Sequence, residues 1–250
     1  MARTLRCTRI ARGTLRGLGI AAYECVLCAL ASCLPAAAIE APPQAAAAAA
    51  PHAYIERLEA GLLLQTLNAD LLSHDSATAT LQRWCDVHQL ASPARITAER
   101  APDVQKPPTR IQREQLHIGP ADEVRYRNVR LRCGELVLSE ADNWYVPARL
   151  TPEMNRLLET TDTPFGVAVQ SLHFQRHTLA AELLWQPLPV GWEMKSSPPD
   201  AAAGELCFPL HVLQHRALLT LPDGTPISEV VETYTSNLLA IPRFAPAHSC

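Results

Sequence analysis

Residues 213–235 read LQHRALLTLPDGTPISEVVETYT and give the clearest strand pattern in the chain. Alternating apolar and polar residues run on both sides of Asp223-Gly224. An Asp-Gly pair between two such runs is typical of the tight turn of a β-hairpin. We therefore predict strands over residues 213–221 and 227–235, paired antiparallel.

A second alternating pattern begins at residue 124. Val129, Leu131 and Cys133 share one predicted strand face, and Gly134 offers a turn into a further strand over residues 136–139. A strand is expected near residues 95–100, and a pair over 167–175 and 178–185 joined around Arg176-His177. Residues 186–209 are expected to form a loop or flap.

Helical spacing marks three other segments. Apolar residues recur every three or four positions over residues 53–73 and again over 76–88, where Asp75 or Ser76 is a suitable N-cap. A short helix is expected after Thr151-Pro152. Helices and hairpins in this order predict an antiparallel α+β domain, with a sheet of about six strands and helices packed on one side.

The N-terminal segment has the organisation of an export signal. Five arginines lie within the first 16 residues, an apolar run covers residues 18–34, and Ala36-Ala37-Ala38 follows. We predict a signal over residues 1–38, an Ala/Pro-rich tether over 39–52 and the folded domain over 53–245. The protein would then be periplasmic, or a membrane-anchored lipoprotein if the lipobox-like Leu30-Ala31-Ser32-Cys33 is lipidated at Cys33. The alternative is a cytoplasmic protein whose N-terminal extension is not a signal.

Charge and cysteine content limit the partners. The net charge is -3 and the pI about 6.3, which argues against nucleic acid. We expect a monomer that meets a membrane only through Cys33. Four cysteines lie outside the leader: Cys85, Cys133, Cys207 and Cys250. They show no zinc-binding spacing, and they can form up to two disulfides, in any of three pairings.

Two charges lie on predicted apolar strand faces. Arg127 shares its face with Val129 and Leu131, and Glu232 shares its face with Val230 and Tyr234. A buried charge needs a partner. The structural alternative is that Arg127 and Glu232 pair with each other or lie at a sheet edge. The functional alternative is that Arg127 binds a ligand carboxylate while Glu232 faces a hydroxyl or ether oxygen of the ligand.

Other chemistries are less well supported. His211 and His215 are four residues apart, as are His173 and His177, but no carboxylate pattern accompanies either pair. The chain has no Gly-x-Ser-x-Gly motif of a serine hydrolase. We expect neither a metal nor a cofactor.

Four short motifs resemble the chorismate lyase superfamily, in the same order and over roughly residues 62–240. They are Asp75-Ser76-Ala77-Thr78, Tyr126-Arg127-Asn128-Val129, Thr163-Pro164-Phe165-Gly166 and Glu232-Thr233-Tyr234. The family eliminates pyruvate from chorismate to give 4-hydroxybenzoate, without a cofactor. The resemblance implies the same fold and a closed pocket for a small aromatic carboxylate.

The resemblance also implies roles for particular residues. Arg127 would bind the ring carboxylate, with help from the backbone at Phe165, and Glu232 would be the catalytic group beside the phenolic oxygen. The backbone near Ala77 would approach the hydroxyl, and Arg176 matches a second arginine near the pocket.

Some features depart from the family. Asn143 stands where the family more often has arginine, the loop over residues 186–209 is longer, and one residue is inserted before Glu232. Chorismate is made and used in the cytoplasm, so an exported protein would meet little of it. The alternative function is therefore an exported, non-catalytic module that binds a small aromatic carboxylate.

Overall fold

The computed structural model describes residues 44–101, 105–197, 199, 205–244 and 248–249. These residues belong to the second of two compact units, which divide after Pro42. The predicted signal over residues 1–38, Cys33 included, lies outside the described residues. None of the helices that are described is both long enough and apolar enough to cross a membrane.

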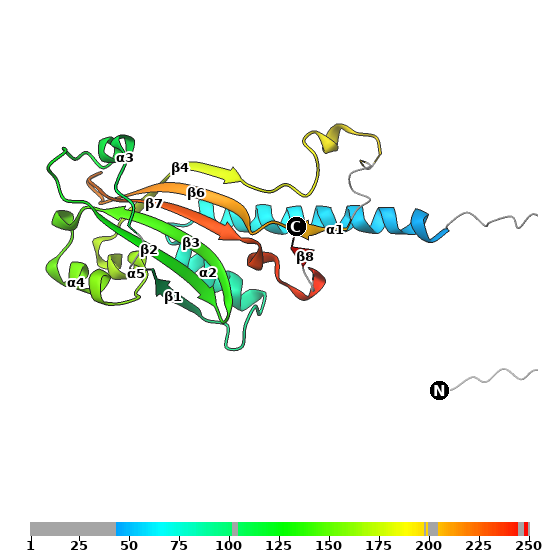
Figure 1. Cartoon of the computed structure of the whole chain (residues 1–250), viewed down its shortest axis with the longest axis horizontal. Coiled ribbons are helices and arrows are strands. Elements are labelled where there is room, and N and C mark those ends of the chain that lie inside the picture. Colours follow the sequence, from blue (N-terminus) through cyan, green and yellow to red (C-terminus); the bar gives the residue numbers. More distant parts are fainter. Residues whose placement is uncertain (1–43, 102–104, 198, 200–204, 245–247, 250) are drawn as a thin grey trace, which may run out of the picture. The chain divides into compact units, whose positions relative to one another are not determined.

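A six-stranded sheet forms the centre of the fold (Figure 1). Every neighbouring pair of strands is antiparallel, which confirms the predicted fold class. In spatial order the strands are β1 (Ile96–Arg100), β2 (Arg125–Cys133), β3 (Leu136–Tyr145), β7 (Pro226–Thr235), β6 (His211–Thr220) and β4 (Gln175–Leu183). The predicted hairpin is β6 and β7, and Gly224 takes the positive φ of 86° that its turn requires. The short strands β5 (Cys207–Phe208) and β8 (His248–Ser249) pair separately.

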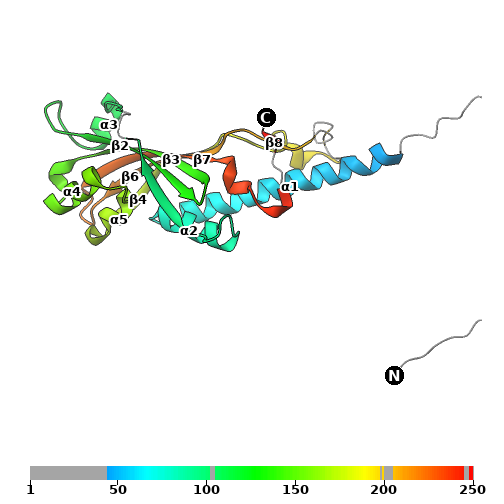
Figure 2. The same ribbon diagram turned by 60° about the horizontal axis from the view of Figure 1, so that its bottom comes forward.

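Four helices lie on one face of the sheet, which we call the inner face, as predicted. They are α1 (Gln44–Leu72), α2 (Ala77–Val87), α4 (Pro152–Thr160) and α5 (Phe165–Ala168). The small helix α3 (Arg110–Gln115) packs on the opposite face, beside Leu116 and Trp144 (Figure 2). Five 3-10 turns complete the described helices: Pro147–Arg149, Gln170–Leu172, Trp192–Met194, Ser236–Leu239 and Pro242–Phe244.

The main core lies between the inner face and the helices α1 and α2. Leu64, Leu67 and Leu71 of α1 are at most 1% exposed, because their spacing places them on one side of the helix. A second cluster, under α4 and α5, contains Leu158 and Phe165. These two clusters fix the helices on the sheet, and the pocket described below lies where the start of α2 and the start of α5 meet the strands.

Three predicted boundaries were wrong. The strand predicted over residues 136–139 is β3, which continues to Tyr145. Helix α1 begins at Gln44, so much of the segment predicted as a tether is helical, consistent with the high helix propensity of its alanines. Residues 165–168 form α5, and β4 runs straight through Arg176-His177 where we had predicted a turn. The apolar run over residues 167–169 is short, and such a run cannot be assigned to helix or strand by periodicity alone.

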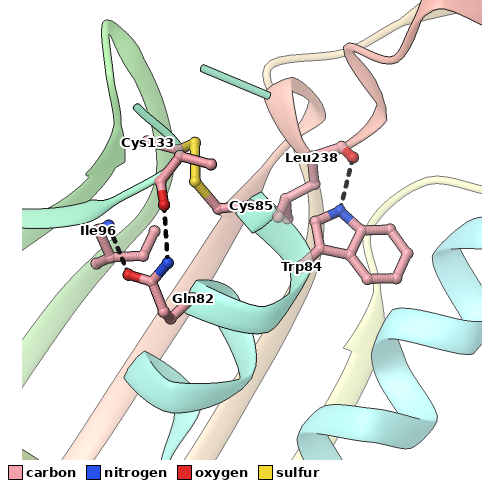
Figure 3. Close-up of a disulfide and its surroundings, with 7 residues drawn as sticks. Gln82, Trp84, Cys85, Ile96, Cys133 and Leu238 are labelled. Carbon is pink, nitrogen blue, oxygen red and sulfur yellow. Dashed lines mark hydrogen bonds between the residues drawn. A yellow bond between two sulfur atoms is a disulfide. The ribbon is translucent and has the colours of Figure 1, made fainter. Parts of the chain in front are cut away.

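A disulfide between Cys85 and Cys133 joins α2 to the end of β2 (Figure 3). Next to it, the Gln82 side chain donates to the Ala94 carbonyl and accepts from Ile96 N, so β1 is also tied to α2. Trp84 donates from its indole to the Leu238 carbonyl at 3.0 Å. Helix α2 is therefore held covalently and by hydrogen bonds to three parts of the fold. Cys207 is also disulfide-bonded, and Cys250 lies outside the described residues.

Candidate functional site

A cavity of about 60 Å³ lies between the inner face of the sheet and the starts of α2 and α5. We call it the Arg127 pocket. Its walls are mainly apolar, and it is lined by all five residues that the sequence indicated: Ala77, Arg127, Phe165, Arg176 and Glu232. The apolar lining residues are Ala77, Val129, Leu131, Ala141, Pro164, Phe165, Gly166, Phe174, Leu219 and Val230, and the polar ones are Asp75, Ser76, Thr78, Arg127, Asn143, Arg176 and Glu232.

Arg127 is held in the pocket by its place in β2. Its side chain points inward because it lies on the same strand face as Val129 and Leu131, and the residue is only 6% exposed. Its Nη2 donates to the Thr161 carbonyl at 3.0 Å, whereas Nε and Nη1 are buried without a hydrogen-bond partner among the described residues. Burial, assisted by the positive charge of Arg100, lowers the pKa of Arg127 to about 10. The guanidinium still carries its charge at neutral pH and has donors to spare.

Glu232 pairs with Arg176 and not with Arg127. Arg176 Nη2 donates to Glu232 Oε2 at 2.5 Å, and the two side chains are 5% and 11% exposed. The Tyr234 hydroxyl donates to the same oxygen at 3.1 Å. Burial alone would lower the pKa of Arg176, but the charge of Glu232 and the hydrogen bond to it raise the pKa above the ordinary value. The alternative in which Arg127 and Glu232 form an ion pair with each other is therefore wrong.

The loop before α2 and the loop before α5 close the pocket. Ser76 caps α2 by accepting from Ala79 N, and Ala77 is the first residue of the helix, where backbone N–H groups lack partners within the helix. Asp75 accepts from Arg176 N at 3.2 Å, which ties this loop to β4. Phe165 begins α5 and is 8% exposed, with its ring against Tyr145.

Asn143 lies beside Arg127 as its register partner on β3. It is 5% exposed and accepts a hydrogen bond from Ser228 at 2.5 Å through Oδ1. Because Asn143 is uncharged, the pocket has a neutral group beside Arg127. Among the described residues that line it, Arg127 is then the cation without a carboxylate partner.

Sequence reasoning missed the role of His215. Residues four apart on a regular strand share a face, but a β-bulge between His211 and Leu213 places His211 and His215 on opposite faces of β6. His211 contacts Glu140, whereas His215 is fully buried, lies against the Tyr234 ring and contacts Asn68 of α1 at 2.8 Å. Burial lowers the pKa of His215 to about 4, so it is neutral at neutral pH. Leu213 and Ala217, two positions to either side of His215, are apolar and indicated a buried strand face, but nothing in the sequence indicated the bulge.

Comparison with known proteins finds a relative that covers most of this chain. The uncharacterized protein y4mC of Sinorhizobium fredii is 53% identical over 193 residues, which cover 77% of this chain and 81% of that protein. The chain belongs to the same family as y4mC. No protein-family model matches the chain.

Solved structures show only distant likenesses. The effector domain of PhnF from Mycobacterium smegmatis is 10% identical with a TM-score of 0.41, covering 65% of this chain and 90% of that one. The C-terminal domain of the histidine utilization repressor from Pseudomonas syringae is 14% identical with a TM-score of 0.37, covering 56% and 92%. Likenesses at this level carry no argument about the ligand or the activity of this chain.

Proposed function

We propose that the protein binds a small aromatic carboxylate in the Arg127 pocket. The observation that carries the proposal is the buried Arg127 guanidinium, whose Nε and Nη1 have no partner among the described residues. An unpaired charge in an apolar site is costly, and a protein tolerates it most readily where a ligand supplies the counter-charge. A carboxylate fits this role because it accepts charge-assisted hydrogen bonds from a guanidinium.

The rest of the pocket limits the ligand. Apolar side chains such as Val129, Leu219 and Val230 surround the cavity. Its volume of about 60 Å³ is below the roughly 150 Å³ of a cavity that binds benzene, so the side chains around it must move apart for a single ring with short substituents to enter. Arg176 is already neutralised by Glu232, and Asn143 is uncharged. One free cation argues for one ligand carboxylate.

The second candidate is the elimination of pyruvate from chorismate to give 4-hydroxybenzoate. It is favoured by the presence of Glu232 in the same pocket as Arg127, where the carboxylate could assist proton movement near the departing ether oxygen. Two features favour binding over this reaction. Chorismate carries two carboxylates, whereas the pocket offers one unpaired cation, and the basic and apolar segment over residues 1–38 supports export away from the cytoplasm.

One experiment separates the candidates. The purified protein and its Arg127→Ala variant are titrated calorimetrically with 4-hydroxybenzoate, and chorismate is then added while 4-hydroxybenzoate formation is followed by absorbance. We expect binding to the wild type, at least tenfold weaker binding to the variant, and no turnover. Turnover that depends on Arg127 would establish the lyase instead. Absence of binding, or equal binding by the variant, would reject the proposed ligand site.

A further inference from the structure

Two buried donors converge on one oxygen of Glu232. Arg176 Nη2 and the Tyr234 hydroxyl both reach Oε2, at 2.5 Å and 3.1 Å. Tyr234 is fully buried, and burial together with the negative charge of Glu232 raises its pKa well above the ordinary value. The phenol therefore keeps its proton and remains a donor. The two donors therefore occupy the same oxygen of Glu232 and restrict the orientation of its carboxylate.

The other oxygen is left for the pocket. Glu232 Oε1 makes no hydrogen bond to any residue that the structure describes, and it is not among the fully buried unpaired atoms. Glu232 itself lines the Arg127 pocket. A carboxylate in an ion pair can only accept hydrogen bonds, so the ligand group that meets Oε1 must be a donor.

A second layer holds Tyr234 in place. The His215 ring packs edge-on against the Tyr234 ring, with centroids 5.4 Å apart, and His215 lies opposite Glu232 in the β6–β7 register. His215 Nε2 contacts Asn68 Oδ1 at 2.8 Å, which links this layer to α1. Because the buried ring is neutral, it adds no second positive charge beside Glu232.

We infer that Arg176 and Tyr234 are positioning residues that determine specificity. By fixing Glu232 as an acceptor towards the cavity, they make the pocket select aromatic carboxylates that carry a hydroxyl or amino group over those that lack a donor. This inference rests on the proposed carboxylate site at Arg127. A site built to bond a ligand donor discriminates strongly against an analogue without one, because its own buried group is then left unpaired.

The test is a calorimetric titration of the full-length protein with near-isosteric ligands. The panel is benzoate and its fluoro, hydroxy and amino derivatives, each in the 3- and 4-substituted series. In at least one series we expect the hydroxy and amino compounds to bind wild type at least tenfold more tightly than the fluoro compound. Equal binding of all the substituted benzoates would overturn the inference and leave the Arg127 site standing. If no benzoate bound, both the specificity inference and the proposed carboxylate site at Arg127 would be rejected.

Glu232→Gln gives a sharper readout than loss of affinity. Arg176 and Tyr234 are both donors, so they should hold the amide oxygen, and the new NH₂ group should face the cavity. A hydroxyl can accept from this NH₂ group but an aromatic amine does so poorly. We therefore expect the amino compound to fall to the affinity of the fluoro compound, with the hydroxy compound at least fivefold tighter. Retained tight binding of the amino compound would contradict the inferred orientation.

Tyr234→Phe tests the positioning itself. We expect the ratio of hydroxy to fluoro affinity to fall by about threefold to tenfold, while benzoate binds within twofold of wild type. Thr235→Val is the matched control. It removes a buried hydroxyl from the next residue of β7, and this hydroxyl donates a hydrogen bond to the Val137 carbonyl. An unchanged ratio in Tyr234→Phe, or an equal fall in Thr235→Val, would show that Tyr234 does not set the specificity.

Discussion

The Glu232 carboxylate pairs with Arg176 at 2.5 Å, and Arg127, which lines the same pocket, has no carboxylate partner among the described residues. The pocket therefore contains one neutralised pair and one free positive charge. The attraction between Glu232 and Arg176 offsets much of the free energy lost when the two charges are buried. The charge of Arg127 has no such offset, so it destabilises the unliganded fold. This asymmetry leads to the first two predictions.

Arg127→Met should stabilise the protein and abolish ligand binding. Methionine fills a similar volume without a charge, so we expect the free energy of unfolding to rise by about 1 kcal/mol or more. Urea denaturation monitored by circular dichroism measures the change, and calorimetry with 4-hydroxybenzoate measures the loss of binding. A variant that is less stable than wild type would mean that Arg127 has a structural role.

Arg176→Ala should be strongly destabilising, because it leaves Glu232 buried without its cation. We expect a loss of about 3–5 kcal/mol in the free energy of unfolding, and Arg176→Met/Glu232→Leu should lose much less. Arg156→Ala is the control, since its pair with Glu153 is 64% and 71% exposed and its loss should leave the stability close to that of wild type. If the single and double variants were equally destabilised, the two residues would not be coupled.

The elements with strong local signals could be predicted from the sequence. The hairpin of β6 and β7 follows from its alternation around Asp223-Gly224, and the start of α4 follows from Thr151-Pro152, where Thr151 accepts from Met154 N. Arg127 and Glu232 stood out because a charge among apolar strand positions breaks the pattern. Their place in one pocket depends on strand order, for which the sequence carries only the resemblance to chorismate lyase.

Features that depend on tertiary contacts could not be predicted. The Cys85–Cys133 pairing was one of three that the sequence left open, and the spacing of cysteines does not choose among them. The partner of Glu232 was also hidden, because Arg176 falls in a segment where we expected a turn. Its inward direction follows from its register opposite Leu219 in β6.

Removal of the Cys85–Cys133 disulfide should cost about 2–4 kcal/mol of unfolding free energy. The bond closes a loop across 48 residues, and both cysteines are fully buried. Because one cross-link is lost in each case, Cys85→Ala, Cys133→Ala and the double variant should be destabilised to a similar extent, within about 1 kcal/mol. Chemical denaturation without reductant measures all three. A double variant as stable as wild type would show that the hydrogen bonds of Gln82 and Trp84 suffice to hold α2.

Glu229→Gln should stabilise the protein at pH 8 and not at pH 4. Glu229 of β7 is fully buried on the α3 side of the sheet, and its carboxylate forms no salt bridge with any residue that the structure describes. Burial raises the pKa of Glu229, partly offset by Arg216 and Gln112. The folded state therefore favours the protonated form, and wild type loses stability as the pH rises from the ordinary value of 4.5 through the raised pKa.

Glutamine does not ionise, so at pH 8 the variant should be more stable by about 1–2 kcal/mol, with no gain at pH 4, where the carboxyl is largely protonated in both states. Urea denaturation at the two pH values measures this, with Glu182→Gln on the exposed strand β4 as the control. A gain of the same size at both pH values would show that the charge of Glu229 is not its cause.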